Sequence, residues 1–462
     1  MHLVETTVKP KEMRGPMKGN KTLNMTQGNP GWLLITFAIP LLIGNVFQQA
    51  YNMADSIIVG QFLGSSALAA VGATGSTGFL FFSLCGGISG GCGVVASQMF
   101  GSGDFKRTQK TIANAAYIMM FFSIVVAVAA YFFAPGLLRL LGTPVDILPD
   151  SIAYLKMTCI GVPLVAVYNY SSSMLRALGD SRTPLYFLIF ASVLNVVLDL
   201  FCICVLHMGV FGAALATVIA QVVAGVGCLL YALKTNPYFH LKRADFELDW
   251  GIVKRSIRIG LPMAMQWSLI AISSTALQAF INTFGANAVA AFTAVGRIEA
   301  FVHMPYGSVN AALSTYAGQN YGANDMKRVK DGFRYGMLMT SLFSVLMMVC
   351  YMAFSETMMR LFVQEPDVIA IGAGGLRLTS WFYIFLAVIY MCRGILNGIG
   401  DALFALINGV VEVVCRVGLP ALLMLIPDIG IDSIWWATGL TWAFAALSCW
   451  FRYCSWKKKI AS

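Results

Sequence analysis

Long apolar stretches dominate this sequence and restrict the chain to one kind of environment. A bilayer core about 30 Å thick needs about 20 apolar residues for each helix that spans it. With 58% hydrophobic and only 11% charged residues, the chain also carries too little charge to cover a soluble globule. We therefore expect an all-α integral membrane protein with twelve transmembrane helices, one for each apolar stretch. The stretches are residues 33–62, 66–97, 110–134, 150–178, 183–206, 210–233, 257–284, 286–318, 333–355, 367–398, 404–425 and 430–454.

The positions of lysine and arginine predict how these helices are oriented. Cytoplasmic segments of membrane proteins carry an excess of both residues. With the N-terminus in the cytoplasm, 25 of the 31 basic residues fall in the two termini and in the loops on the same side. Both termini are therefore expected to be cytoplasmic. The net charge of +10 then indicates topology and attraction to anionic lipid, and not nucleic-acid binding. The loops counted are 98–110, 176–182, 234–258, 319–334 and 393–403.

Residues in the second half of the chain match residues in the first half at one constant separation in the sequence, which is the separation between Gln98 and Gln319. Each copy contains six predicted spans, an even number, so both copies enter the membrane in the same sense. Secondary transporters use this layout, with the two repeats related by an axis along the membrane normal. The identities are Gln98, Gly101, Asp104, Lys106 and Arg107 with Gln319, Gly322, Asp325, Lys327 and Arg328, and Leu175, Gly179 and Asp180 with Leu396, Gly400 and Asp401.

The repeat predicts how the chain is divided. We expect two six-helix lobes joined by a basic loop, with a polar tail at each end. The expected segments are a cytoplasmic N-terminal tail at 1–30, an N-terminal lobe at 31–233, a cytoplasmic inter-lobe linker at 234–256, a C-terminal lobe at 257–454 and a basic cytoplasmic tail at 455–462.

Carboxylates inside the predicted spans are the strongest functional signal. A charged side chain near the bilayer centre costs about 2.5–3.5 kcal/mol, so such residues face the protein interior. Asp55, Asp199 and Thr217 each lie about seven residues from the outer end of their span, which places them roughly 10 Å below the outer surface. Asn195 lies one turn deeper than Asp199 on the same helical face. We expect these four residues to form one buried cation site.

The second repeat lacks this set. At the same offset, Ala276, Arg416 and Pro420 replace Asp55, Asn195 and Asp199. A carboxylate pair needed only to hold six helices together would be expected in both lobes, so the asymmetry favours a functional site. Two carboxylates close together in a low dielectric repel each other, and such a pair can take up a proton or a sodium ion.

Local motifs make the chain similar to the multidrug and toxic-compound extrusion (MATE) family over about residues 30–455. They are Asn52-Met53-Ala54-Asp55-Ser56 leading to Val59-Gly60 and Gly64, Arg176-Ala177-Leu178-Gly179-Asp180 before Pro184, and Asn195 with Asp199. The resemblance implies that Asp55, Asn195, Asp199 and Thr217 form the proton or sodium site of the N-terminal lobe.

The resemblance also implies that the first helix can bend at Pro40. A proline inside a helix removes one hydrogen bond and permits a kink. A static kink is the alternative, because Pro262 holds the equivalent place in the second repeat.

A second set of intramembrane charges leaves two interpretations open. It comprises Arg297, Glu299, Glu412 and Arg416. Glu412 and Arg416 are spaced four residues apart and can pair within one helix, whereas Arg297 and Glu299 face apart. The set serves either structural ion pairing or a secondary role in substrate binding or coupling.

Together these features predict an antiporter of the bacterial inner membrane that exports amphipathic, cationic organic compounds against an inward flow of H+ or Na+. We expect it to act as a monomer, with no cofactor beyond the coupling ion and no metal beyond Na+ at the coupling site. A Walker A pattern and convergent catalytic motifs such as HExxH are missing from the sequence, which argues against ATP as the direct energy source and against an enzyme. The alternatives are a flippase for lipid-linked precursors, which needs a strongly basic central cavity, and a channel, which needs no coupling pair.

Overall fold

The computed structural model describes residues 22–426 and 429–461, and this part of the chain is helical throughout, without strands. The expected all-α class is confirmed. The helices are α1 (Pro30–Leu63), α2 (Ser65–Gly101), α3 (Phe105–Leu140), α4 (Leu148–Ala177), α5 (Arg182–Leu200), η1 (Phe201–Val205), α6 (Gly209–Thr235), η2 (Pro237–Phe239), η3 (Arg243–Phe246), α7 (Trp250–Asn282), α8 (Ala286–Gly322), α9 (Met326–Arg360), α10 (Pro366–Ser380), α11 (Tyr383–Ile399), α12 (Ala402–Leu423) and α13 (Asp432–Ala461).

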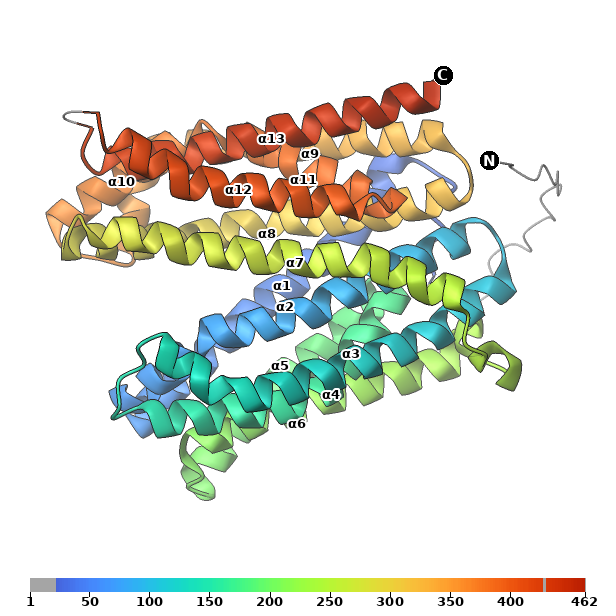
Figure 1. The fold of residues 1–462 in the computed structure, drawn as a ribbon, viewed down its shortest axis with the longest axis horizontal. Coiled ribbons are helices and arrows are strands. Elements are labelled where there is room, and N and C mark those ends of the chain that lie inside the picture. Colours follow the sequence, from blue (N-terminus) through green and yellow to red (C-terminus); the bar gives the residue numbers. More distant parts are fainter. Residues whose placement is uncertain (1–21, 427–428, 462) are drawn as a thin grey trace.

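The long helices run roughly side by side along the length of the molecule (Figure 1). In the described residues, nine helices are long and apolar enough to cross a membrane, and α10 with α11, bent by 55°, makes a tenth if the pair counts as one span. Helices α8 and α13 are also long, at 37 and 30 residues, but are not among the apolar spans. Helix α8 carries Arg297, Glu299 and His303, and α13 ends in basic residues. The helical segments therefore follow the twelve predicted stretches, although two of them are too polar to be recognised by hydropathy alone.

The repeated aspartates have the same structural task in both halves of the chain. Asp104 is the N-cap of α3 and accepts a hydrogen bond from the backbone N–H of Arg107 at 2.9 Å. Asp325 is the N-cap of α9 and accepts one from the backbone N–H of Arg328 at 3.0 Å. An N-cap side chain satisfies a helix N–H that lacks an intrahelical partner. These positions of the repeat therefore define where the third helix of each half begins.

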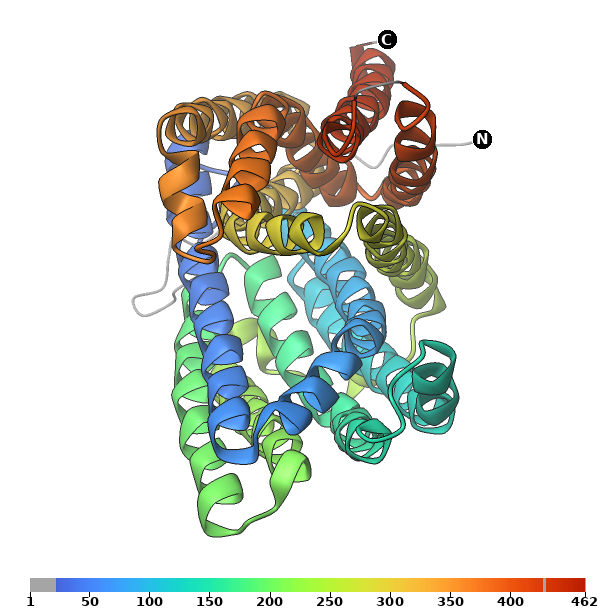
Figure 2. The same ribbon diagram turned by 90° about the vertical axis from the view of Figure 1, so that its left-hand side faces the viewer.

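The first helix of each repeat packs against the other repeat. Near its start, α1 contributes Leu33, Leu34 and Phe37 to a core formed with α8, α9, α11 and α13. In the other direction, α7 lies along α2, where Gly87 and Gly91 pack directly on the α7 backbone with no room for a Cβ atom. Figure 2 shows α1–α6 and α7–α13 as two groups of helices that meet along these contacts. The glycine-rich stretch of α2 thus serves close helix packing.

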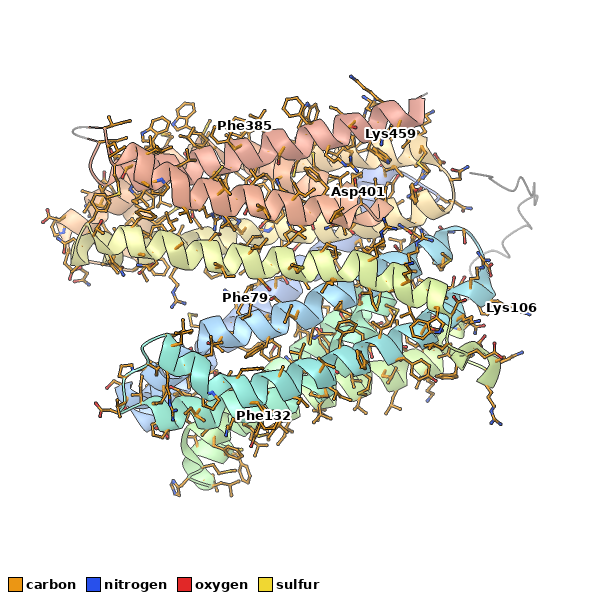
Figure 3. The ribbon with its side chains drawn as sticks, in the orientation of Figure 1. Phe79, Lys106, Phe132, Phe385, Asp401 and Lys459 are labelled. Carbon is orange, nitrogen blue, oxygen red and sulfur yellow. The ribbon has the colours of Figure 1, made fainter. Side chains whose placement is uncertain are left out.

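The surface is divided into an apolar side and a charged end. The end called here the basic end is formed by the connections α2–α3, α4–α5, α6–α7, α8–α9 and α11–α12 and by the last turns of α13. Figure 3 shows Lys106 and Lys459 at this end, whereas Phe132 lies on the long side of the bundle. Phe132 is 74% exposed, as expected for a side chain that faces lipid.

Candidate functional site

The structure brings the four N-terminal candidates together. The Asn195 amide of α5 donates a hydrogen bond from Nδ2 to Thr217 Oγ1 of α6 at 3.2 Å. The Asp55 carboxyl of α1 and the Asp199 carboxyl of α5 interact directly with each other. Three helices therefore place their polar side chains at one level. Their depth in the membrane stays a prediction.

The site is rich in acceptors and poor in donors. Asp199 is fully buried, and Asp55 and Asn195 are buried as well. Within the described residues, both carboxylate oxygens of Asp199, Oδ1 of Asp55 and Oδ1 of Asn195 have no hydrogen-bond donor of acceptable geometry. Burying oxygens without partners costs free energy. A proton shared by the carboxyls, or a hard cation such as Na+ that prefers oxygen ligands, would satisfy them.

The backbone beside Asp199 is irregular. Helix α5 ends at Leu200 and continues as the π-helical turn η1. The backbone N–H of Leu206 donates to the carbonyl of Phe201, five residues earlier, at 3.0 Å. Single π-helical turns often occur at functional sites. This turn directs the end of α5 toward α6 and follows the buried aspartate by two residues.

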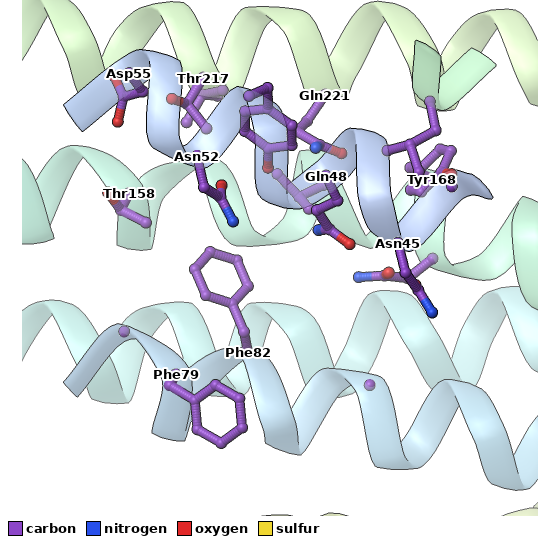
Figure 4. Close-up of a pocket in the computed structure, with 18 of the residues that line it drawn as sticks. Asn45, Gln48, Asn52, Asp55, Phe79, Phe82, Thr158, Tyr168, Thr217 and Gln221 are labelled. Atoms are coloured by element: carbon purple, nitrogen blue, oxygen red, sulfur yellow. The ribbon is translucent and has the colours of Figure 1, made fainter. Parts of the chain in front are cut away.

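A large cavity opens beside the carboxylate pair. Its volume is about 750 Å³, and it is lined by α1, α2, α4, α5 and α6, all from the first repeat. Asp55 and Thr217 lie toward one end of it (Figure 4). Phe79 and Phe82 line it from α2, and Phe82 points toward the polar side chains of α1 (Figure 4). Ligand pockets for drug-sized molecules commonly measure about 300–1,000 Å³, so the cavity is large enough for one.

Sequence reasoning missed most of the polar cavity wall. Asn45, Gln48, Asn52 and Asp55 all line the cavity from α1. Their spacing of three, four and three residues is the periodicity of one helical face, and this stripe was visible in an otherwise apolar span. Tyr51 adds side-chain contacts to Gln48 and to Gln221 of α6. The opposite wall, where α2, α4 and α6 contribute to the cavity, could not be read from any one helix.

Helix α1 runs through Pro40 as one continuous helix. Pro40 itself lines the cavity, fifteen residues before Asp55. Because proline has no backbone N–H, the carbonyl of Thr36 lacks its usual intrahelical partner. A bend at this position therefore remains a prediction.

The prediction that Glu412 pairs with Arg416 is wrong. Glu412 of α12 instead bonds to Arg393 of α11, and both side chains are almost completely buried. Asn408 accepts from Arg393 Nε at 2.8 Å and donates to the carbonyl of Ala445 at 2.9 Å. Counting Arg393 as a loop residue was also wrong, because α11 extends to Ile399. Arg393 lies inside that helix and faces α12.

The other members of the second set make their hydrogen bonds with different partners. Arg416 donates from Nη1 to Ser274 Oγ at 2.9 Å and to Ser273 Oγ at 3.3 Å. Glu299 accepts from Thr379 and Tyr383 hydroxyls, each at 3.3 Å. The remaining residue, Arg297, is exposed. Three of the four residues nevertheless belong to one polar region, because Arg416 interacts electrostatically with Glu299, and His303 interacts with both Arg416 and Glu412.

An all-helical bundle with an internal repeat and a buried acidic pair beside a cavity defines a polytopic membrane transporter. The family comparison specifies the kind. A model of the MatE family matches residues 40–201 and again residues 262–422, so the chain belongs to this family, and the resemblance inferred from the motifs is confirmed. The second matched range follows the first at the offset of the internal repeat, to within one position at each end.

Individual relatives support the same assignment. The chain is 31% identical over 441 residues to a probable multidrug resistance protein, YpnP, of Bacillus subtilis (strain 168), covering 95% of this chain and 98% of the relative. It is 28% identical to a second such protein of that organism, YoeA, covering 80% and 81%. Among solved structures, one described as the crystal structure of MATE in the bent conformation superimposes with a TM-score of 0.89 at 24% identity, covering 96% of this chain and all of that one. This last likeness supports the fold.

Proposed function

We propose that this protein is a multidrug efflux antiporter that exports amphipathic organic cations in exchange for protons or sodium ions. The carboxylate pair of Asp55 and Asp199 carries the proposal. It is buried, short of hydrogen-bond donors and located beside a drug-sized cavity in the same repeat. The names of the relatives YpnP and YoeA as probable multidrug resistance proteins support efflux as the physiological direction.

The cavity wall suits a flat, greasy cation. Aromatic side chains can stack on a planar ring system or attract its positive charge, and here Phe79, Phe82, Tyr154 and Tyr168 line the space. Asp55 contributes the negative charge at one end. Amide side chains along α1 offer donors and acceptors that do not demand one particular geometry. Such a wall favours binding of many different compounds over selectivity for one compound.

The coupling ion and the drug are proposed to favour opposite states. An ion bound at Asp55 and Asp199 neutralises the repulsion between the carboxyls and satisfies oxygens that otherwise lack donors. Binding at that level therefore changes the relative energy of the conformations of α1, α5 and α6. A ligand shifts a conformational equilibrium only by its difference in affinity for the two states, so the cavity must hold the drug less tightly once the ion is bound.

Alternating access is supported by paired contacts at the basic end. Gln98 Nε2 of α2 donates to the carbonyl of Gly398 at 2.7 Å, and Gln319 Nε2 of α8 donates to the carbonyl of Ala177 at 2.9 Å. The two donors are partners in the internal repeat, and the two acceptors are separated by the same offset. Each repeat thus holds the other through the same bond. We name this pair of bonds the glutamine latch.

Glycines allow the latch to close tightly. Gly101 packs on the backbone of Gln319, and Gly322 packs on the backbone of Gln98, each with no space for a Cβ atom. These glycines are also repeat partners. The basic end is proposed to be cytoplasmic, by the excess of lysine and arginine there. The latch would then close the cytoplasmic side, and the conformation described here would be one in which the drug path faces outward.

We further propose that the protein resides in the bacterial inner membrane with both termini in the cytoplasm and works as a monomer, since the cavity and the carboxylate pair come from one chain. The alternative of a flippase for lipid-linked precursors is less well supported. That activity calls for a strongly basic cavity, whereas Arg176 is the one arginine or lysine among the residues that line this one.

Reconstituted wild-type protein is expected to drive a fluorescent cationic dye across vesicle membranes against its gradient. The measurement imposes a proton gradient and a sodium gradient separately and follows dye fluorescence with time. The gradient that drives transport identifies the coupling ion. Dye flux that runs only down its own gradient, whichever ion gradient is imposed, would indicate a channel and refute the proposal.

Removing the glutamine latch is expected to open the basic end. Each hydrogen bond contributes about 0.5–1.5 kcal/mol, so Gln98→Ala with Gln319→Ala should shift the equilibrium between the closed and open basic end by roughly 5- to 150-fold. Cys92 provides the readout, because it is fully buried in α2 about two turns from Gln98. Peptide mapping after treatment with a small thiol reagent should show faster labelling of Cys92 in the variant.

Gln109→Ala is the matched control for this experiment. Gln109 donates to the carbonyl of His240 in the α6–α7 connection at 2.9 Å, so its loss removes a glutamine hydrogen bond without touching either bond of the glutamine latch. Cys92 labelling should stay at the wild-type rate in that variant. Equal labelling rates in the control and in the latch variant would rule out a gating role for the latch.

A further inference from the structure

A second cavity lies at the basic end, away from the proposed transport site. Its volume is about 570 Å³, and it is formed by the start of α7, the α11–α12 connection and α13. None of its lining residues is shared with the large cavity of the first repeat. We name it the basic pocket. Its lining residues are Gly251, Lys254, Arg255, Arg258, Ile259, Ile399, Gly400, Asp401, Leu403 and Arg452.

Positive charge dominates this pocket. Four of the lining residues are lysine or arginine, and Asp401 is the one carboxylate among them. Asp401 is engaged by Arg452, whose Nε lies 2.7 Å from Asp401 Oδ2. Arg255 donates to the side chain of Gln98. Lys254 and Arg258 are exposed and make no ion pair within the described residues, so two cations remain available to an anion.

On the α7 side of the pocket, the anion must be bound by side chains. The first backbone N–H groups of α7 are already capped, because Asp249 Oδ1 accepts from Gly251 N at 2.9 Å and from Ile252 N at 3.2 Å. A phosphate group fits the available donors well, since lysine and arginine both bind phosphate oxygens through charge-assisted hydrogen bonds.

The surroundings point to a lipid as the source of the phosphate. Trp250 at the start of α7 is 72% exposed, and Leu403 on the rim of the pocket is 60% exposed. Trp450, on α13 two residues before Arg452, is also exposed. Tryptophan concentrates at the level of lipid headgroups, and basic pockets between transmembrane helices bind anionic headgroups. Figure 3 shows Asp401, one of the lining residues, near the basic end of the bundle.

We propose that the basic pocket is a binding site for the phosphodiester headgroup of an anionic phospholipid. Lys254 and Arg258 contact the phosphate, and exposed Leu403 lies beside the first segment of an acyl chain. The site holds a lipid that stays in its own leaflet, and it is separate from the path of the exported compound. Arg255 links the pocket to Gln98 and hence to the glutamine latch.

Native mass spectrometry of the purified full chain tests the proposal. Short-chain phosphatidylglycerol is titrated against wild-type protein and against Lys254→Gln with Arg258→Gln, and phosphatidylcholine with the same chains serves as the neutral comparison. Each basic residue near an anionic lipid contributes about a factor of five in affinity. We expect the double variant to bind phosphatidylglycerol about twenty- to thirtyfold more weakly, and to lose much less affinity for phosphatidylcholine, whose choline cation offsets the charge of its phosphate.

Controls separate this site from general charge and from folding defects. Lys106→Gln with Lys327→Gln removes the same charge from two exposed, repeat-related lysines at the basic end, and should leave the affinity near that of wild type. Leu403→Glu adds a carboxylate at the rim without removing a cation and should also weaken binding. Equal losses in the lysine control and in the pocket variant, or no loss in the pocket variant, would overturn the proposal. Competition by inorganic phosphate or glycerol 1-phosphate at the same concentration as the lipid would overturn the lipid as the source.

Discussion

Asp199→Asn is expected to slow ion-driven dye efflux strongly while dye binding is retained. Asparagine keeps the size of the side chain but cannot be ionised, so the site can no longer take up and release the coupling ion. Asp199 is fully buried and directly faces Asp55, so no neighbouring carboxylate can take over its task without moving. Coupling free energies between two binding sites typically correspond to roughly 5- to 150-fold changes in affinity. We expect a loss of about that size in the initial efflux rate.

The comparison includes Asp55→Asn and one matched control. Asp55→Asn should give the same loss, because the proposed site needs both carboxyls. Asp146→Asn neutralises an exposed aspartate of the first repeat in the α3–α4 connection and should transport at the wild-type rate. Reconstituted vesicles with the effective gradient imposed provide the measurement, and equilibrium dye binding to the purified variants provides the second readout. If both buried variants pump normally, coupling lies elsewhere, and Glu299 and Glu412 become the next candidates.

Arg393→Ala is expected to destabilise the second repeat strongly. It removes the partner of Glu412 and one partner of Asn408, both of which are buried. Breaking a buried ion pair by deleting one partner costs about 3–5 kcal/mol, since the other charge is left without compensation. The midpoint of thermal unfolding in detergent should therefore fall markedly relative to wild type.

An exposed ion pair supplies the control for that prediction. Arg377 Nη2 lies 2.9 Å from Glu356 Oε1, and both side chains are largely accessible. Exposed pairs contribute about 0–1 kcal/mol, so Arg377→Ala should unfold close to the wild-type midpoint. Replacing both buried partners, by Arg393→Met with Glu412→Leu, should recover part of the lost stability. An Arg393→Ala midpoint equal to that of Arg377→Ala would contradict the assignment of a buried structural pair.

Properties that depend on one helix at a time were predictable from the sequence. Span positions follow from the length of each apolar stretch, because every helix must cover the same bilayer thickness. The constant rise of the α-helix along its axis gave the expectation that Asp55, Asp199 and Thr217 share one level. The internal repeat indicated which motifs recur. For the motif that contains Asp104 and Asp325, the reason for the recurrence is that both residues cap the start of a helix. The family followed from local motifs of the same kind.

Properties that depend on how helices face one another were decided only by the tertiary structure. Glu412 has a candidate partner one turn away in Arg416, yet it pairs with Arg393 of another helix. Which arginine pairs with Glu412 depends on how α11 and α12 are rotated about their axes. The spacing of residues within α12 does not contain that information. The same reason applies to the cavity, whose wall combines five helices, and to the latch, in which Gln98 and Gln319 each reach a carbonyl of the opposite repeat. A sequence specifies depth along each helix, whereas contacts across helices arise from packing that joins residues hundreds of positions apart.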